Sequence, residues 1–200
     1  MIKAQTMIKR SLQATALSLI LMTPNLHAST AMSDNELKNV KKTEVTDIKE
    51  REKLSKVAGL LAEYEIEAKK LVNSLDSTDL TIAMVNQRAN TLLALSETII
   101  ESARFRLPQC DEYLSKTLLL KDMLGTISNE TLEKDYHHDG ALPKAPVECY
   151  HTKDLFVHPA TVSVLTRDDP SLKQETKDSI NAEISEVLGH IELVRQLVIY

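Results

Sequence analysis

The chain of 200 residues contains no tryptophan, only two cysteines and only four glycines. No stretch approaches the ~20 consecutive apolar residues that span a bilayer, which argues against a membrane anchor. Apolar and polar residues nowhere alternate over a useful length, so no β-strands are expected. The chain also lacks the Gly-x-Ser-x-Gly motif of serine hydrolases and the Cys-x-x-Cys-His motif of covalent haem attachment. We therefore expect a protein that is not an enzyme.

Acidic residues outnumber basic ones, with 29 Asp and Glu against 24 Lys and Arg. The first 28 residues hold three of the basic residues and no acidic one, so their removal leaves 21 against 29. A chain this acidic, without a basic stripe, argues against nucleic acid or an anionic lipid surface as a partner.

The beginning of the chain predicts a secretory signal peptide. It combines a basic start, an apolar run and small residues at two candidate cleavage sites: Lys3, Lys9 and Arg10; Leu12 to Met22; and Ala28 or Ala31. No cysteine lies near either cleavage site, so an amino-terminal lipid anchor is not expected. We expect residues 1–28 to be the signal peptide and the remainder to be periplasmic or secreted.

Residues 29–46 are polar and aperiodic, and we expect a disordered leader there. From residue 47 to residue 200, apolar residues recur at alternating steps of three and four, which predicts helices that bury one face. Breaks near residues 76–79, 108, 125–129 and 169–170 separate the helices. The pattern predicts an all-α, antiparallel four-helix bundle with a short extra helix at 130–138 and one ordered loop at 139–148 that contains two prolines. The fourth helix, 149–167, should be kinked or interrupted at Pro159.

Cys110 and Cys149 are the two cysteines, and in an oxidising compartment they are expected to form one disulfide. Both are expected to lie at helix starts. The chain between them must therefore run out and return, which requires the break at 125–129.

The stretch from Asp135 to Pro159 concentrates residues that bind metals. His151 and His158 lie on the apolar stripe of the fourth helix, where a buried imidazole needs a hydrogen-bond partner or a metal ion. They are separated by about 10.5 Å along a straight helix, which is too far to share one ion unless Pro159 bends the helix. The preceding segment could bring one of His137 and His138 near as a third ligand. The candidate metal ligands are His137, His138, His151, His158 and Asp154. Without a metal, Asp154 is the expected partner of His158.

We therefore expect an exported helical bundle that binds a ligand at 135–159, with a transition-metal ion as the leading cofactor candidate. A first alternative is a structural or protein-binding module that presents Tyr136, Tyr150 and Phe156 to a protein partner. A second is a bundle that binds haem non-covalently through His151 or His158 and a methionine, Met84 or Met123. The sequence further suggests that His190 lies at the surface or boundary, and that Glu183 and Glu186 are solvated.

Overall fold

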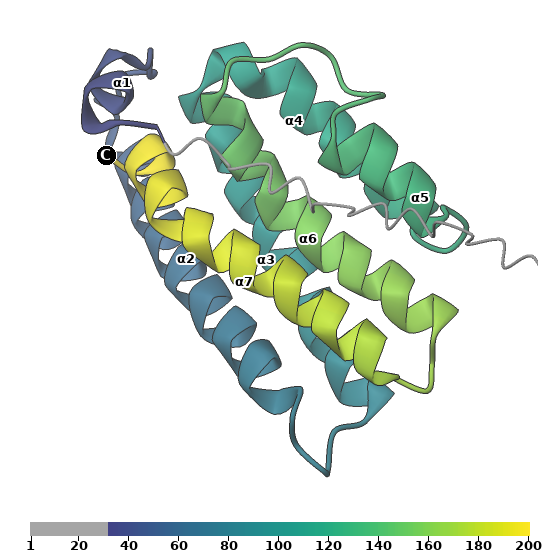
Figure 1. Ribbon diagram of the computed structural model, residues 1–200. Helices are drawn as coiled ribbons and strands as arrows, with labels where there is room; N and C mark the ends of the chain where they lie inside the picture. Colours follow the sequence, from purple (N-terminus) through teal and green to yellow (C-terminus); the bar gives the residue numbers. More distant parts are fainter. Residues whose placement is uncertain (1–31) are drawn as a thin grey trace, which may run out of the picture. The chain divides into compact units, whose positions relative to one another are not determined.

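The computed structural model describes residues 32–200, so the predicted signal peptide and its cleavage sites lie outside the described residues. Four long helices form the bundle (Figure 1): α2 Ile48–Ser74, α3 Ile82–Arg106, α6 Glu148–Asp168 and α7 Gln174–Val198. They pack in the order α2, α3, α6, α7, with α7 closing onto α2. Between residues 32 and 200 there is no strand, and no helix is long and apolar enough to cross a membrane. The predicted all-α bundle is confirmed.

Most apolar residues at the predicted steps of three and four form the bundle core. On α2 and α7 the buried ones are Val57, Leu61, Tyr64, Ala68 and Leu71, and Ile180, Ile184, Val187, Ile191, Val194 and Val198. Leu54, the first residue of the α2 stripe, is half-buried. Burying one such large apolar side chain stabilises the fold by roughly 1.5–3 kcal/mol. This gain exceeds the small loss of helix stability that the β-branched Val and Ile residues cause.

An accessory layer of short helices connects α3 to α6. It comprises η1 Pro108–Cys110, α4 Asp111–Leu118, η2 Leu119–Met123, α5 Asn129–Leu132 and the π-helical η3 Glu133–His137. The predicted break separates η2 from α5, and the Ser128 hydroxyl caps α5 by accepting a hydrogen bond from the Thr131 amide. Because α4, α5 and η3 pack against α6, that helix has little surface left for solvent (Figure 1). Every residue from His151 to Val162 is buried.

Helix α6 continues through Pro159, where a kink or interruption was expected. A proline has no amide hydrogen, so the carbonyl four residues earlier loses its helical partner. That carbonyl belongs to Leu155, and the buried Tyr64 hydroxyl donates a hydrogen bond to it at 2.8 Å. Tyr64 on α2 thus replaces the bond that Pro159 removes.

The predicted disulfide joins Cys110, just before α4, to Cys149 in the first turn of α6, and both residues are fully buried. The disulfide holds the carboxyl end of the loop between η3 and α6, and backbone contacts hold its amino end. Asp139 has a φ of 61°, and the Gly140 amide donates to the Lys134 carbonyl at 2.9 Å. A Cβ on Gly140 would lie 2.6 Å from that carbonyl oxygen, so only glycine fits the turn.

Within the range predicted as a leader, residues 32–46 include one short helix and contacts with the bundle. Helix α1, Asp34–Asn39, begins with a capping box in which Ser33 and Glu36 each accept a hydrogen bond from the other's backbone amide. Farther along, the Thr43 amide donates to the Arg106 carbonyl at 2.9 Å. The capping box and this contact with the end of α3 give the segment a defined path that its polar composition does not reveal.

Candidate metal centre

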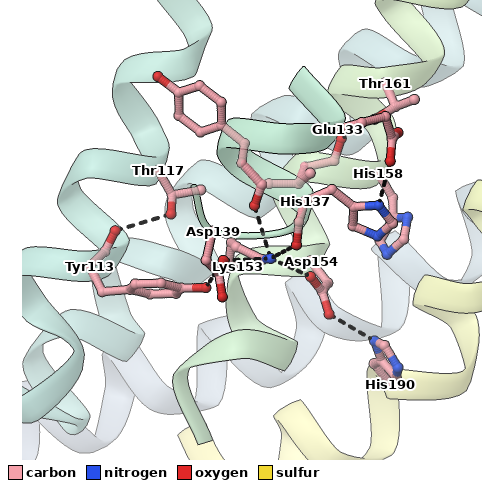
Figure 2. A network of polar contacts seen from close by, with 12 residues as sticks. Tyr113, Thr117, Glu133, His137, Asp139, Lys153, Asp154, His158, Thr161 and His190 are labelled. Carbon is pink, nitrogen blue, oxygen red and sulfur yellow. Dashed lines mark hydrogen bonds and ion pairs between the residues drawn. The ribbon is translucent and has the colours of Figure 1, made fainter. Parts of the chain in front are cut away.

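Polar side chains face one another across the α6–α7 interface. On α6, His151, Asp154 and His158 follow steps of three and four residues, and on α7 Glu183, Glu186 and His190 follow the same steps. Residues with this spacing share one face of a helix. Figure 2 shows His190 directed toward Asp154, while His137, from the end of η3, lies beside His158. The site therefore combines α6, α7 and the accessory layer.

We call His137, His158 and Glu186 the outer cluster. One ligand atom from each residue lies within 4.8 Å of the other two. The Nδ1 atom of His137 lies 2.9 Å from a Glu133 carboxylate oxygen, and Nδ1 of His158 lies 2.8 Å from Glu183. Each ring therefore has Nε2 left for coordination, and Nε2 of His158 is buried without a hydrogen-bond partner.

The separation of the two outer rings fits one shared ion. Two imidazoles on a tetrahedral Zn²⁺, with Zn–N bonds of about 2.0–2.1 Å, have ring centres about 5 Å apart. The ring centres of His137 and His158 are 4.9 Å apart. Glu186 is exposed and His137 half-buried, so this cluster opens toward solvent.

We call His151, Asp154 and His190 the inner cluster. All three residues are buried, and their ligand atoms also lie within 4.8 Å of one another. Nδ1 of His190 lies 3.2 Å from Asp154, and the rings of His151 and His190 meet edge to face at 4.6 Å. Neither ring nitrogen of His151 has a hydrogen-bond partner, although the residue is only 4 % exposed.

Pairing with carboxylates shifts the protonation of the outer cluster. The hydrogen bond from His137 lowers the pKa of Glu133, and the same bond raises the pKa of His137. Glu133 therefore stays ionised and keeps the Nδ1 hydrogen of His137 in place. Nε2 is then the atom of His137 that can coordinate, and a metal ion must displace the proton that the raised pKa favours there.

Burial acts in opposite directions on the inner cluster. It lowers the pKa of His151, which keeps this imidazole neutral and able to coordinate. Burial alone would raise the pKa of Asp154. The hydrogen bond from His190 and the positive charge of Lys153 outweigh that effect, so the pKa of Asp154 lies below its usual range.

Lys153 attaches the accessory layer to α6 at the centre of the site (Figure 2). Its ammonium group donates to the carbonyls of Tyr136 and His137, at 3.0 and 2.7 Å, and to Asp139 at 3.0 Å. Lys153 is only 2 % exposed and also lies 3.4 Å from Asp154. By holding the end of η3, it sets the position of His137 beside His158.

The predicted ligands divide between these clusters. His151 and His158 lie in the interior, as the heptad pattern indicated, and His137 is the group from the preceding segment that reaches His158. His138 is exposed and lies beside His137, with ring centres 5.2 Å apart. With Glu133 these two histidines form a third group whose ligand atoms lie within 4.8 Å of one another. Asp154 is not hydrogen-bonded to His158 as expected, because Glu183 holds that ring from across the α6–α7 interface.

Sequence reasoning missed the contribution of α7. His190 is 8 % exposed and pairs with Asp154, so its assignment to the surface or boundary was wrong. Glu183 binds His158 and is not simply part of a solvated face. The signal was present in the repeated spacing of three and four residues, but heptad reasoning follows apolar residues and ignores a polar stripe beside them.

The aromatic side chains named for the first alternative are buried or hydrogen-bonded within the fold, and the haem alternative stays a prediction. Phe156 is fully buried and Tyr136 is 9 % exposed, so neither is presented to a partner. The Tyr150 hydroxyl donates to the Ala145 carbonyl within the loop. Met84, one of the two suggested axial ligands for haem, is 37 % exposed.

Comparison with known proteins identified no relative. No family model, curated protein or solved structure matches the chain.

Proposed function

We propose that this chain is an exported, non-enzymatic protein that binds a divalent transition-metal ion at the outer cluster, with Zn²⁺ as the first choice. Two imidazoles and one carboxylate, with a side open to solvent, are a ligand set that Zn²⁺ accepts while keeping a fourth position for water. The hard ions Mg²⁺ and Ca²⁺ prefer a complete set of oxygen ligands, which this cluster does not offer.

The observation that carries the proposal is the pair of carboxylates behind the two histidines. Glu133 and Glu183 hold Nδ1 of His137 and of His158, at 2.9 and 2.8 Å. Histidines that coordinate metals almost always donate their other ring hydrogen to such a partner, which fixes the tautomer and strengthens the ligand. A histidine that is merely buried needs one partner, but not a second histidine beside it with the same arrangement.

The local charge supports the same proposal. Four carboxylates belong to or adjoin the two clusters: Glu133, Glu183, Glu186 and Asp154. Of these four, only Asp154 forms an ion pair with Lys153, whose ammonium group also pairs with Asp139. The resulting excess of negative charge attracts a divalent cation.

Export is proposed from the basic and apolar beginning of the chain together with the disulfide. Disulfides form and persist in oxidising compartments such as the bacterial periplasm. The single bridge between Cys110 and Cys149 uses both cysteines of the chain.

The test is titration of Zn²⁺ into metal-free protein purified without a histidine tag, followed by calorimetry. Glu186→Gln removes a charged ligand at an exposed position and should weaken binding at the outer cluster at least 10-fold. Glu183→Gln leaves every ligand in place and should cost about 10–100-fold, because it removes a partner that orients His158. The matched control is Glu175→Gln, the same change at an exposed position of α7, which should leave the affinity unaltered.

Circular dichroism of each variant should match that of the unaltered chain, since none of these three substitutions removes a core side chain. The proposal is abandoned if the unaltered protein has no site tighter than millimolar. It also fails if Glu186→Gln and Glu183→Gln bind Zn²⁺ as tightly as Glu175→Gln.

A further inference from the structure

His151 is the buried polar side chain that the outer cluster does not use. It is 4 % exposed, and both of its ring nitrogens lie without a hydrogen-bond partner. Leaving a buried polar atom unpaired costs roughly 1–3 kcal/mol. An apolar side chain of similar size would avoid that cost. Stability of the fold therefore does not explain the imidazole at this position, whereas a ligand that binds its nitrogens would.

The surroundings of His151 provide the other ligands for a metal ion. Asp154 and His190 each place one ligand atom within 4.8 Å of His151 and of each other. The ring centres of His151 and His190 are 4.6 Å apart, close to the value of about 5 Å for two imidazoles on one tetrahedral ion. Asp154 is 8 % exposed and His190 is 8 % exposed, so solvent does not compete for their ligand atoms.

One tetrahedral ion does not join the inner and outer clusters through His158 and His190. The nearest rings measured across the two clusters, those of His158 and His190, have centres 6.5 Å apart. That separation exceeds the value of about 5 Å expected for a shared tetrahedral ion. Each cluster also has its own carboxylate, Glu186 in one and Asp154 in the other.

We infer that His151, Asp154 and His190 form a second metal site, so that the bundle holds two divalent transition-metal ions in neighbouring compartments. The inner ion has two nitrogen ligands and one oxygen ligand, a set suited to Zn²⁺, Co²⁺ or Ni²⁺. That the bundle holds two ions in all rests on the proposed function, which supplies the outer one. The inner ligands themselves do not depend on it.

The two compartments differ in access to solvent, and this gives them different exchange rates. The outer cluster includes the exposed Glu186, whereas all three inner ligands, from α6 and α7, are buried. A chelator in solution should therefore remove the outer ion first. Release of the inner ion requires local opening of the α6–α7 interface, which is slower.

The experiment loads the untagged full chain with Zn²⁺, removes loosely held metal by gel filtration, and measures bound metal by elemental analysis. His151→Phe keeps the edge-to-face ring contact with His190 and removes both nitrogens. Since those nitrogens make no hydrogen bond, the metal-free variant should fold and should be at least as stable as the unaltered chain. Glu186→Gln serves as the reciprocal variant for the outer site, and Glu175→Gln as the control.

The unaltered chain and Glu175→Gln should each retain two Zn²⁺ ions per chain. His151→Phe and Glu186→Gln should each retain one. A chelator chase should be biphasic for the unaltered chain, without its slow phase in His151→Phe and without its fast phase in Glu186→Gln. If His151→Phe binds as much metal as the unaltered chain, the inner site is refuted, whatever Glu186→Gln does. If His151→Phe loses an equivalent while Glu186→Gln loses none, the inner site stands and the proposed outer site fails.

Should His151→Phe not fold, His151→Leu provides the second variant, since leucine also fills buried space without a polar atom. Co²⁺ absorption then separates the sites independently of stoichiometry. The inner site predicts a tetrahedral Co²⁺ spectrum that persists in Glu186→Gln, and its disappearance from that variant would overturn the inference.

Discussion

The Tyr64 hydroxyl on α2 donates a hydrogen bond to the Leu155 carbonyl of α6 at 2.8 Å, in the fully buried core. This carbonyl has no helical partner because Pro159, four residues later, has no amide hydrogen. The bond joins diagonally related helices of the bundle beside the histidine clusters. It therefore satisfies a buried carbonyl on α6 between His151 and His158.

Replacing Tyr64 by phenylalanine should lower the free energy of unfolding by about 1–3 kcal/mol, because a buried carbonyl would lose its partner. Urea denaturation measures the change. In a Pro159→Ala background the new amide can donate to Leu155, so the same substitution should cost less there. Equal costs in both backgrounds would show that Tyr64 does not compensate for the proline. Tyr200→Phe, at a 68 % exposed position, is the control.

Replacing Lys153 by methionine should lower the free energy of unfolding by roughly 3–5 kcal/mol, because the change leaves buried carbonyls and Asp154 without their cation. Zn²⁺ affinity at the outer cluster should fall as well, since Lys153 donates to the His137 carbonyl and so positions that ligand. Denaturation and calorimetry measure the two effects. Lys144→Met, at an exposed lysine, should change neither. Unaltered Zn²⁺ affinity in folded Lys153→Met would exclude the positioning role.

Removing the disulfide by the double substitution Cys110→Ala and Cys149→Ala should cost about 4 kcal/mol in the loop-entropy model, since the bridge spans 39 residues. Trypsin should then cut after Lys144 faster than in the oxidised protein, because the bridge anchors the start of α6 next to this loop. Denaturation and mass spectrometry of the fragments measure these outcomes. Rapid cleavage at Lys144 in oxidised protein would instead indicate a loop that the bridge does not hold.

Stability in acid should depend on Asp169, which organises the connection between α6 and α7. Hydrogen bonds from Ser171 and Thr176, and from the Lys173 amide, lower the pKa of Asp169 in the folded state. Its contribution is therefore fully present above the unfolded pKa of about 3.9 and is lost as the pH falls toward the folded value. The stability advantage of the unaltered chain over Asp169→Ala should be constant from pH 7 to pH 5 and should shrink at pH 3. A gap that stays constant down to pH 2 would rule out this linkage.

Most of the fold could be predicted from the sequence, because helix ends depend on local residues and buried helix faces on periodic ones. Steps of three and four residues identify the buried face of a helix whatever it packs against, and Pro108 and the segment 125–129 mark helix ends through backbone geometry. The disulfide followed from having only two cysteines. Pro159 does not interrupt α6, which the sequence could not show because the group that compensates for it, Tyr64, is distant in sequence.

The composition of the site was decided by the tertiary structure. The sequence indicated that His151 and His158 face inward, but not that the accessory layer covers the opposite side of α6. Only that packing buries Lys153 and brings His137, rather than His138, to His158. Likewise, Glu183 and His190 become part of the site only because α7 lies antiparallel against α6. Periodicity reports which residues share a face, whereas the groups that meet across two faces depend on helix rotation and register, which contacts between distant segments determine.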